Sequence, residues 1–150
     1  MKKSIILYRE VLIMKKSFKF ALGYLIFGLC IGIFNHEIAY YTHFEGKTVL
    51  SLVHGHAFVL GTTVFLLLPL FIKVFHIDKM KDFKKFFVIY NMGLICSLLF
   101  MSIRGITQLY QMNISSFADH MIGGLAGIGH VILTIGIYFF FKLLFAIKEA

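Results

Sequence analysis

The chain has 150 residues, of which 59% are hydrophobic and 15% charged, and its formal net charge is +8. Soluble domains are close to half apolar and a quarter charged, so this composition excludes an ordinary soluble domain and indicates a membrane protein. The positive charge does not indicate a nucleic-acid partner, because the lysines lie in short segments between apolar runs and form no basic face interleaved with aromatic residues.

The chain begins with a basic segment, residues 1–17, that we expect to lie in the cytoplasm. Within it, Met14 is followed by Lys15 and Lys16 and is a second potential start of translation, which would make residues 1–13 an extension. Residues 18–147 are predicted to form a single transmembrane domain.

Four apolar runs follow, at residues 18–34, 49–72, 86–110 and 117–145. Each can cross a hydrocarbon core of about 30 Å, which takes about 20 helical residues. None shows the alternation of a membrane β-barrel. The sequence therefore predicts an all-α membrane protein, a bundle of four transmembrane helices that run up, down, up and down.

Basic residues indicate how this bundle lies in the membrane. They gather in the N-terminal segment, in the loop of residues 73–85 and in the C-terminal tail, whereas the other two loops hold only Lys47 and no arginine. Basic loops of membrane proteins face the cytoplasm. We therefore expect a multi-pass protein of the cell membrane with both termini inside.

Every predicted helix carries polar residues at a similar depth. Counted from the cytoplasmic end of each span at about 1.5 Å per residue, they lie about 21 to 27 Å up. Polar side chains inside a membrane span are costly and usually serve function. Their convergence predicts one shared site in the outer leaflet. The residues are Asn35, His36, Glu37, His54, His56, Arg104 and His130.

The fourth helix presents small residues on the face of His130. Helical offsets of seven, four and three residues place Gly123, Ala126 and Gly127 on that face. Two interpretations are open for this groove: close helix packing through Gly123 and Gly127, or a flat cofactor that lies against them. The histidine at the lower end of the groove favours the cofactor.

The two histidines of the second helix face different ways, about 200° apart around the helix axis. His54 shares its face with small residues such as Ser51 and Gly61, whereas His56 lies among bulky residues such as Val59. The sequence therefore favours His54 as a ligand, with His56 in a supporting role or at a second site.

Haem b is the cofactor that this pattern predicts. A helical bundle that holds haem needs imidazoles at matching height on different helices and a gap wide enough for the macrocycle. His54 and His130 are the expected iron ligands, and Gly123 and Gly127 the expected flat wall. Arg104 is placed to bind a propionate through two hydrogen bonds. The expected role is electron transfer, quinol-linked, or haem binding and sensing.

Two alternatives stay open. A zinc or copper ion would draw on the histidines and Glu37, although no HxxxH or HExxH spacing supports such a site. Alternatively, the polar cluster only holds the bundle together, with Arg104 paired to Glu37, and the protein is a structural or partner subunit. The expected partners are the lipid bilayer, a quinol or other redox partner, and a second copy in a homo-oligomer. Whether the protein is an enzyme is left open.

Three stretches carry a family resemblance: LVHGHAFVLG at residues 52–61, SIRGI at 102–106 and GLAGIGHVILTIG at 124–136. They resemble a bacterial family of four-helix membrane proteins, the domain of unknown function 2871, over nearly the whole chain from about Phe18. The resemblance implies four spans. In the family the first helix tends to end with Arg-Glu, and here these positions hold His36 and Glu37, so that only Glu37 matches.

The stretch VHGHAFVL also resembles, more loosely, the helix that bears the low-spin haem ligand in haem-copper oxidases and nitric oxide reductases. That helix often begins with a histidine, a small residue and then an apolar run. The resemblance covers only this stretch, and it implies His54 as the haem ligand by fold-level analogy. Small bacterial four-helix membrane proteins that bind haem b are also known as a type.

Overall fold

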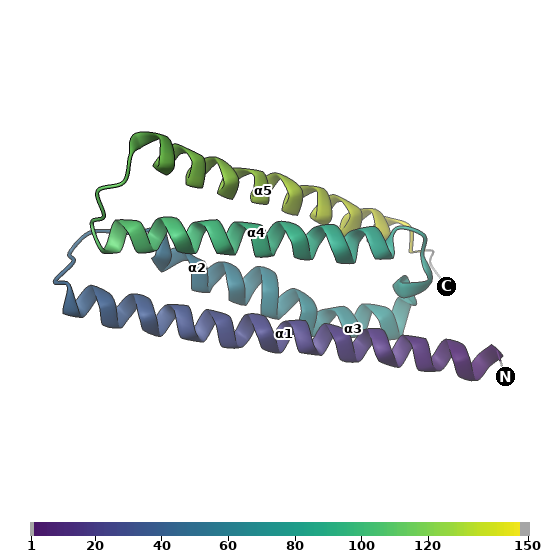
Figure 1. The fold of residues 1–150 in the computed structure, drawn as a ribbon. Helices are drawn as coiled ribbons and strands as arrows, with labels where there is room; N and C mark the ends of the chain where they lie inside the picture. The colour runs from purple at the N-terminus through teal and green to yellow at the C-terminus, as the bar shows by residue number, and fades with distance from the viewer. Residues whose placement is uncertain (1, 148–150) are drawn as a thin grey trace.

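The computed structural model describes residues 2–147, which form helices joined by short loops, with no strand in that part of the chain (Figure 1). Four helices are long and apolar enough to cross a membrane. The predicted all-α fold with four membrane-length helices is therefore confirmed. The elements are α1 (Lys2–Tyr41), α2 (Leu50–His56), the π-helix η1 (Ala57–Thr63), α3 (Val64–Phe75), the 3₁₀-helix η2 (Ile77–Lys79), α4 (Phe83–Leu109) and α5 (Ser116–Phe145).

The first helix is longer than the apolar run that predicts it. The run covers residues 18–34, whereas α1 extends from Lys2 to Tyr41 and is about 60 Å long at the rise of an α-helix. The residues before Phe18 are mostly good helix formers and include no glycine or proline. The helix therefore continues beyond the apolar run in the N-terminal direction.

The four membrane-length helices form two hairpins. In the N-terminal hairpin, α1 packs against α2, η1 and α3, which follow one another without a break from Leu50 to Phe75 and are called the second rod. In the C-terminal hairpin, α4 packs along α5. The two hairpins are joined by contacts of α2 with α4, and both chain ends lie at the same end of the bundle (Figure 1).

Glycines bring the backbones of α4 and α5 close together. A Cβ atom added at Gly129 would lie 2.6 Å from the backbone nitrogen of Ser97, and one added at Gly136 would lie 2.6 Å from the Cα of Tyr90. Small residues at such contacts let membrane helices approach until their backbones touch. The C-terminal hairpin is therefore a tightly packed unit.

A π-helical segment follows directly after His56 in the second rod. The hydroxyls of Thr62 and Thr63 donate to carbonyl oxygens five residues back, at 3.3 and 3.0 Å. Tyr90 of α4 donates its hydroxyl to the carbonyl oxygen of Leu60 within the segment, at 2.8 Å. A π-turn holds one residue more than an α-turn, so it rotates the parts of the rod on its two sides by about 100° relative to each other.

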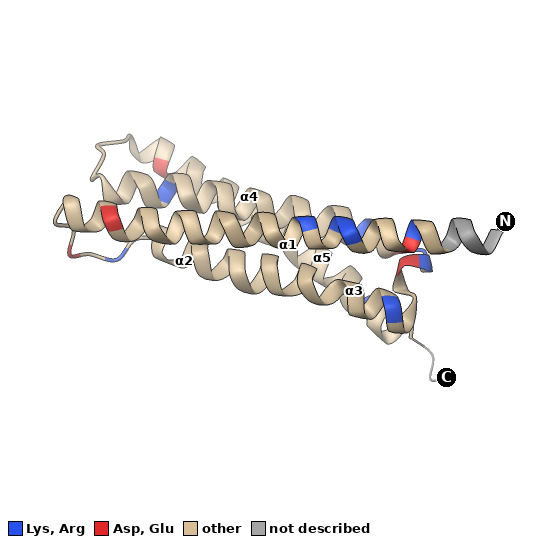
Figure 2. Cartoon of the chain, turned by 90° about the horizontal axis from the view of Figure 1, so that it is seen from below, with Lys and Arg blue, Asp and Glu red and all other residues tan. Residues whose placement is uncertain are grey.

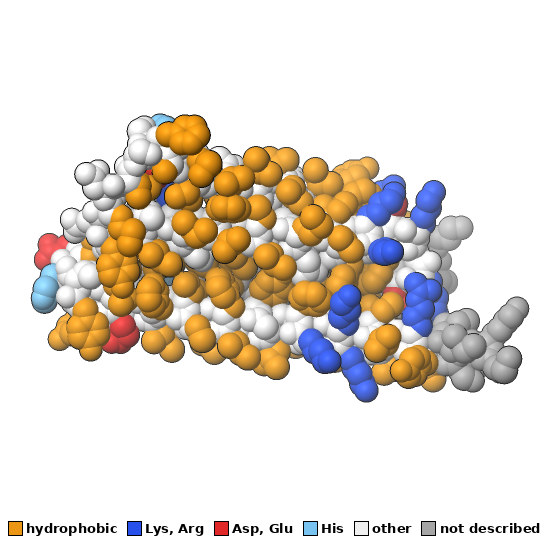
Figure 3. All heavy atoms as spheres, in the orientation of Figure 1, with side chains coloured by type: hydrophobic (Ala, Val, Ile, Leu, Met, Phe, Trp, Pro, Cys, Tyr) orange, Lys and Arg blue, Asp and Glu red, His pale blue; other side chains and the backbone are white. Residues whose placement is uncertain are grey.

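Charged side chains gather at the ends of the bundle. Most lysines lie at the end that holds both chain termini (Figure 2). Exposed leucine, isoleucine, valine and phenylalanine side chains cover the sides between the two ends (Figure 3). An apolar belt of this size on helices of membrane length is what a lipid bilayer covers. The chain is thus a multi-pass membrane protein, and the basic end is the one that we expect to face the cytoplasm.

Candidate functional site

The imidazole rings of His56 and His130 lie side by side between the two hairpins. His56 comes from the last turn of α2 and His130 from the middle of α5. Their ring centres are 6.0 Å apart, and the ring planes make an angle of 87°. These are two of the histidines that the sequence places at one height, and they come from the second and fourth spans as expected.

The sequence favours His54 as the partner of His130, but the neighbour of His130 in the structure is His56. The reason lies in the buried stripe of the second rod, where Val53 of α2 and Ala57 of η1 have no exposed surface. His56 lies on one side of this stripe, toward α5, and His54 lies on the other, toward α1. The bulky neighbours of His56 that argued against it, such as Val59, point outward.

His54 packs against α1 instead. A Cβ atom added at Gly32 of α1 would lie 3.6 Å from the Cβ of His54, and the His54 ring contacts the edge of Phe58 at 6.1 Å between ring centres. Its Nδ1 atom is buried and has no hydrogen-bond partner among the residues that the structure describes. His54 is thus separated from the imidazole pair by the buried stripe of the second rod.

Both rings of the pair are held by their own helices. The Nδ1 atom of His56 donates to the carbonyl oxygen of Leu52 at 2.9 Å, and that of His130 donates to the carbonyl oxygen of Ala126 at 2.8 Å. A neutral imidazole that donates from Nδ1 carries its lone pair on Nε2. Histidines that bind metals are commonly oriented in this way, with one ring nitrogen on a backbone carbonyl and the other free for the metal.

The helices that carry the imidazole pair also carry glycines with open space beside them. Cβ atoms added at Gly55, Gly124 or Gly127 would meet no side chain or neighbouring helix within 4 Å among the described residues. Gly55 precedes His56, and Gly127 lies one turn before His130. The close packing of α5 on α4 uses Gly129 and not Gly127. Of the two interpretations of the glycine groove, the geometry leaves Gly127 free for a flat ligand.

Arg104 of α4 lies two turns above His130, beside α5. Its Nη2 atom is 3.2 Å from Oδ2 of Asp119, and a Cβ atom added at Gly123 would lie 3.1 Å from its Nη1 atom. Its Nε atom is buried and has no hydrogen-bond partner among the described residues. The guanidinium group therefore lies against the upper part of the glycine groove, with one donor unused among the described residues.

Arg104 does not pair with Glu37, which was one expectation from the sequence. Glu37 lies on α1 beside His36, with 3.3 Å between His36 Nδ1 and Glu37 Oε1, and both side chains are exposed. The partner of Arg104 is Asp119, because the end of α4 that carries Arg104 packs along α5. The sequence assigned no role to Asp119, although its place in the first turn of α5, just across the loop from Arg104, was a usable signal.

The imidazole pair offers two nitrogen ligands from two different hairpins. Within residues 2–147, no three His, Cys, Asp or Glu side chains come close enough together to hold an ion, whereas zinc sites use three or four protein ligands. A haem iron takes four nitrogens from the macrocycle and needs only one or two from the protein. The 6.0 Å between the ring centres would allow both imidazoles to bind one metal, whether a haem iron or a bare ion.

Comparison with known proteins identifies a family. A search of curated proteins and a search of solved structures each give no match. The sequence profile of a family described as a protein of unknown function, DUF2871, matches residues 14–147. This match confirms the resemblance carried by the stretches around His54, Arg104 and His130. It covers nearly the whole chain, and the protein belongs to the DUF2871 family.

Proposed function

We propose that this protein binds haem b between α2 and α5, in the outer leaflet, through His56 and His130. The observation that carries the proposal is the imidazole pair itself, with 6.0 Å between ring centres on two different hairpins. When bound, haem supplies one-electron chemistry between ferric and ferrous iron. The residues of the chain bind the iron, orient the rings and position the macrocycle.

Each residue of the site has a distinct task in this proposal. His56 and His130 offer Nε2, because Nδ1 of each ring donates to a carbonyl oxygen four residues back. Gly127 leaves room for the flat face of the macrocycle. Arg104 holds a propionate through its unused Nε donor, which lies about 10 Å above His130 at two helical turns.

Electron transfer, with a quinol as electron donor, is the role that we favour, followed by haem binding or sensing. If His56 and His130 both held the iron, the chain would leave no open position for gas binding or for chemistry at the metal, which favours electron transfer. A zinc or copper protein is the alternative. It would have only two of the predicted ligands in contact, because His36 and Glu37 are exposed on α1.

Absorption spectra test the proposal. Protein purified from haem-replete cells should show a Soret band of six-coordinate low-spin haem in both oxidised and reduced states. His56→Ala and His130→Ala should each abolish the low-spin spectrum. His54→Ala is the matched control on the same helix, and it should keep the spectrum.

Several outcomes would overturn this proposal. A purified protein without a Soret band rejects haem binding, and stoichiometric zinc or copper in the same sample supports the alternative. A spectrum lost in His54→Ala but kept in His56→Ala would reject the ligand assignment and restore the expectation from the sequence.

A further inference from the structure

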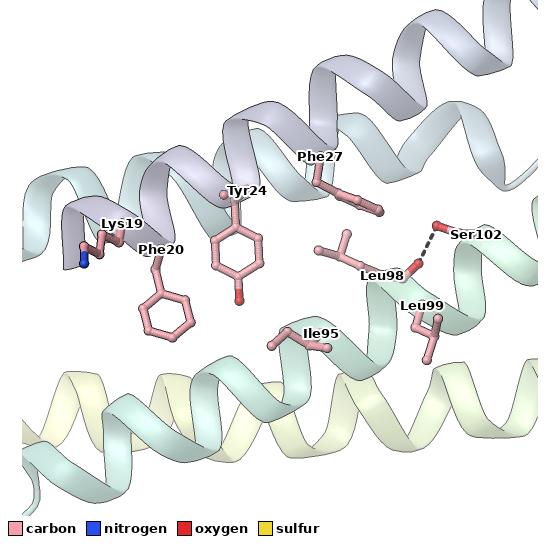
Figure 4. Close-up of a pocket in the computed structure, with 9 residues that line it drawn as sticks. Lys19, Phe20, Tyr24, Phe27, Ile95, Leu98, Leu99 and Ser102 are labelled. Carbon is pink, nitrogen blue, oxygen red and sulfur yellow. Dashed lines mark hydrogen bonds between the residues drawn. The ribbon is translucent and has the colours of Figure 1, made fainter. Parts of the chain in front are cut away.

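A second feature lies away from the imidazole pair: a groove of about 380 Å³ between α1 and α4 (Figure 4). The two helices belong to different hairpins and leave this space because α1 packs mainly on the second rod. The groove runs lengthwise, with Lys19 at one end and Ser102 at the other. Its apolar walls include Phe20, Tyr24 and Phe27 of α1 and Ile95 and Leu99 of α4.

The polar groups in the walls are already used inside the protein. Tyr24 donates its hydroxyl to Oδ1 of Asn91 at 2.9 Å. Ser102 donates its hydroxyl to the carbonyl oxygen of Leu98 at 2.6 Å. The walls therefore present mainly hydrocarbon and aromatic surface, and their two hydroxyl hydrogens are already donated inside the protein. The occupant that suits them is an alkyl chain.

One end of the groove is positively charged, in contrast to its apolar walls. Lys19 lines the groove, and the ammonium group of Lys16 lies 6.0 Å from the ring centre of Phe20 and 5.3 Å from that of Phe87. Within the described residues, no carboxylate forms a salt bridge with either lysine. Two unpaired cations thus stand at the mouth of an apolar groove, where an anionic headgroup complements them.

We propose that the groove binds one anionic phospholipid, with an acyl chain between α1 and α4 and the phosphate on Lys16 and Lys19. Basic pockets between membrane helices on the cytoplasmic side are known binding sites for anionic headgroups. The lipid fills the space that the two hairpins leave open and holds α1 against α4. The proposal is independent of haem, because its residues are separate from the imidazole pair.

Gly23 gives a clean way to block the groove. A Cβ atom added there would meet no other helix within 4 Å among the described residues, so the side chain of Gly23→Leu would start in open space and extend into the groove that Gly23 lines. Native mass spectrometry of the purified protein, titrated with phosphatidylglycerol or with phosphatidylcholine, measures the binding. We expect at least a tenfold preference for phosphatidylglycerol, one molecule per chain.

Two variants and a control complete the test. Lys16→Ala/Lys19→Ala should remove the preference, and Gly23→Leu should weaken phosphatidylglycerol binding about tenfold. Lys84→Ala removes an exposed lysine outside the groove, so it should leave binding unchanged. Equal binding of the two lipids, or unchanged binding in both variants, rejects the proposal. So does a dimer that cross-links through Gly23→Cys, because a second copy then covers the groove.

Discussion

At the scale of single residues, hydrogen bonding separates three histidines that the sequence places at one height. His56 and His130 each have Nδ1 committed to a backbone carbonyl, which fixes the ring and leaves Nε2 with the lone pair. His54 has a buried Nδ1 without a partner among the described residues. In the proposed site the first two can therefore bind iron through Nε2, whereas His54 has no such orienting hydrogen bond among the described residues.

The ion pairs of Asp82, at the opposite end of the bundle, predict that the stability of the protein depends on pH. It lies 2.7 Å from Lys142 of α5 and 3.2 Å from Lys85. Hydrogen bonds from Lys142 and Lys85 lower the pKa of Asp82 below its ordinary value of 3.8. Because the folded-state pKa is lowered, the stabilisation is fully present above pH 3.8 and is lost as the pH falls through the lowered value.

We therefore expect Asp82→Asn to lower the melting temperature by a few degrees at neutral pH and to make little difference in strong acid. The melting temperatures of wild type and variant in detergent, at neutral pH and in strong acid, measure this difference. Lys84→Ala serves as the control for loss of a charge near the same helix end. An effect of Asp82→Asn that is equally large in strong acid would show that the ion pair is not its cause.

At the scale of elements, the π-helix η1 decides which way the histidines of α2 face. It lies between the histidines and the lower half of the second rod, where Phe65, Leu68 and Ile72 are buried in the core. The extra residue of the π-turn changes the rotation of α2 relative to α3 about the axis of the rod. With this rotation, the buried residues of α2 and those of α3 both face the core of the bundle. π-turns of this kind often occur at functional sites.

Deletion of Thr63 tests this role. The side chain is exposed, so its removal costs little packing, but the deletion restores an α-helix and rotates α2 by about 100° relative to α3. His56 should then leave His130, and the low-spin haem spectrum should be lost while the helical circular dichroism is kept. Thr63→Ala keeps the chain length and should keep the spectrum. A deletion variant with the wild-type spectrum would contradict the role of the π-turn.

The elements also show what the sequence could predict. Four apolar runs located the four membrane-length helices, because hydrophobic length is a direct requirement of the bilayer. The π-turn could not be predicted, since Thr62 and Thr63 are ordinary residues in an α-helix. The sequence favours His54 as the ligand, whereas the structure brings His56 next to His130. The buried stripe through Val53 and Ala57 depends on which neighbours surround the rod, and a single helix does not specify them.

At the scale of the whole molecule, the proposed site joins the two hairpins. His56 belongs to the N-terminal hairpin and His130 to the C-terminal hairpin, which otherwise meet mainly through α2 and α4. A ligand held by both histidines binds the assembled bundle and not the separated hairpins. Any such ligand stabilises the folded state by mass action, by about 2.7 kcal/mol when its free concentration is one hundred times its dissociation constant.

This arrangement predicts a difference between protein with and without haem. Protein purified from haem-deficient cells should melt at a lower temperature than the same protein after addition of haem, as measured by fluorescence-detected size exclusion. The melting temperature of the His56→Ala/His130→Ala variant should not increase when haem is added. An equal increase in that variant would mean that haem binds elsewhere on the protein.

Because His56 and His130 belong to different hairpins, they are synthesised at different times. His56 precedes His130 by 74 positions in the chain, since 130 minus 56 is 74. At about 5 to 20 residues per second, a ribosome needs roughly 4 to 15 seconds to add the second histidine after the first. α5 must then enter the bilayer and pack on α4 before the two rings can meet. Under the proposed function, haem would therefore bind His56 and His130 together only after the last helix has inserted and packed on α4.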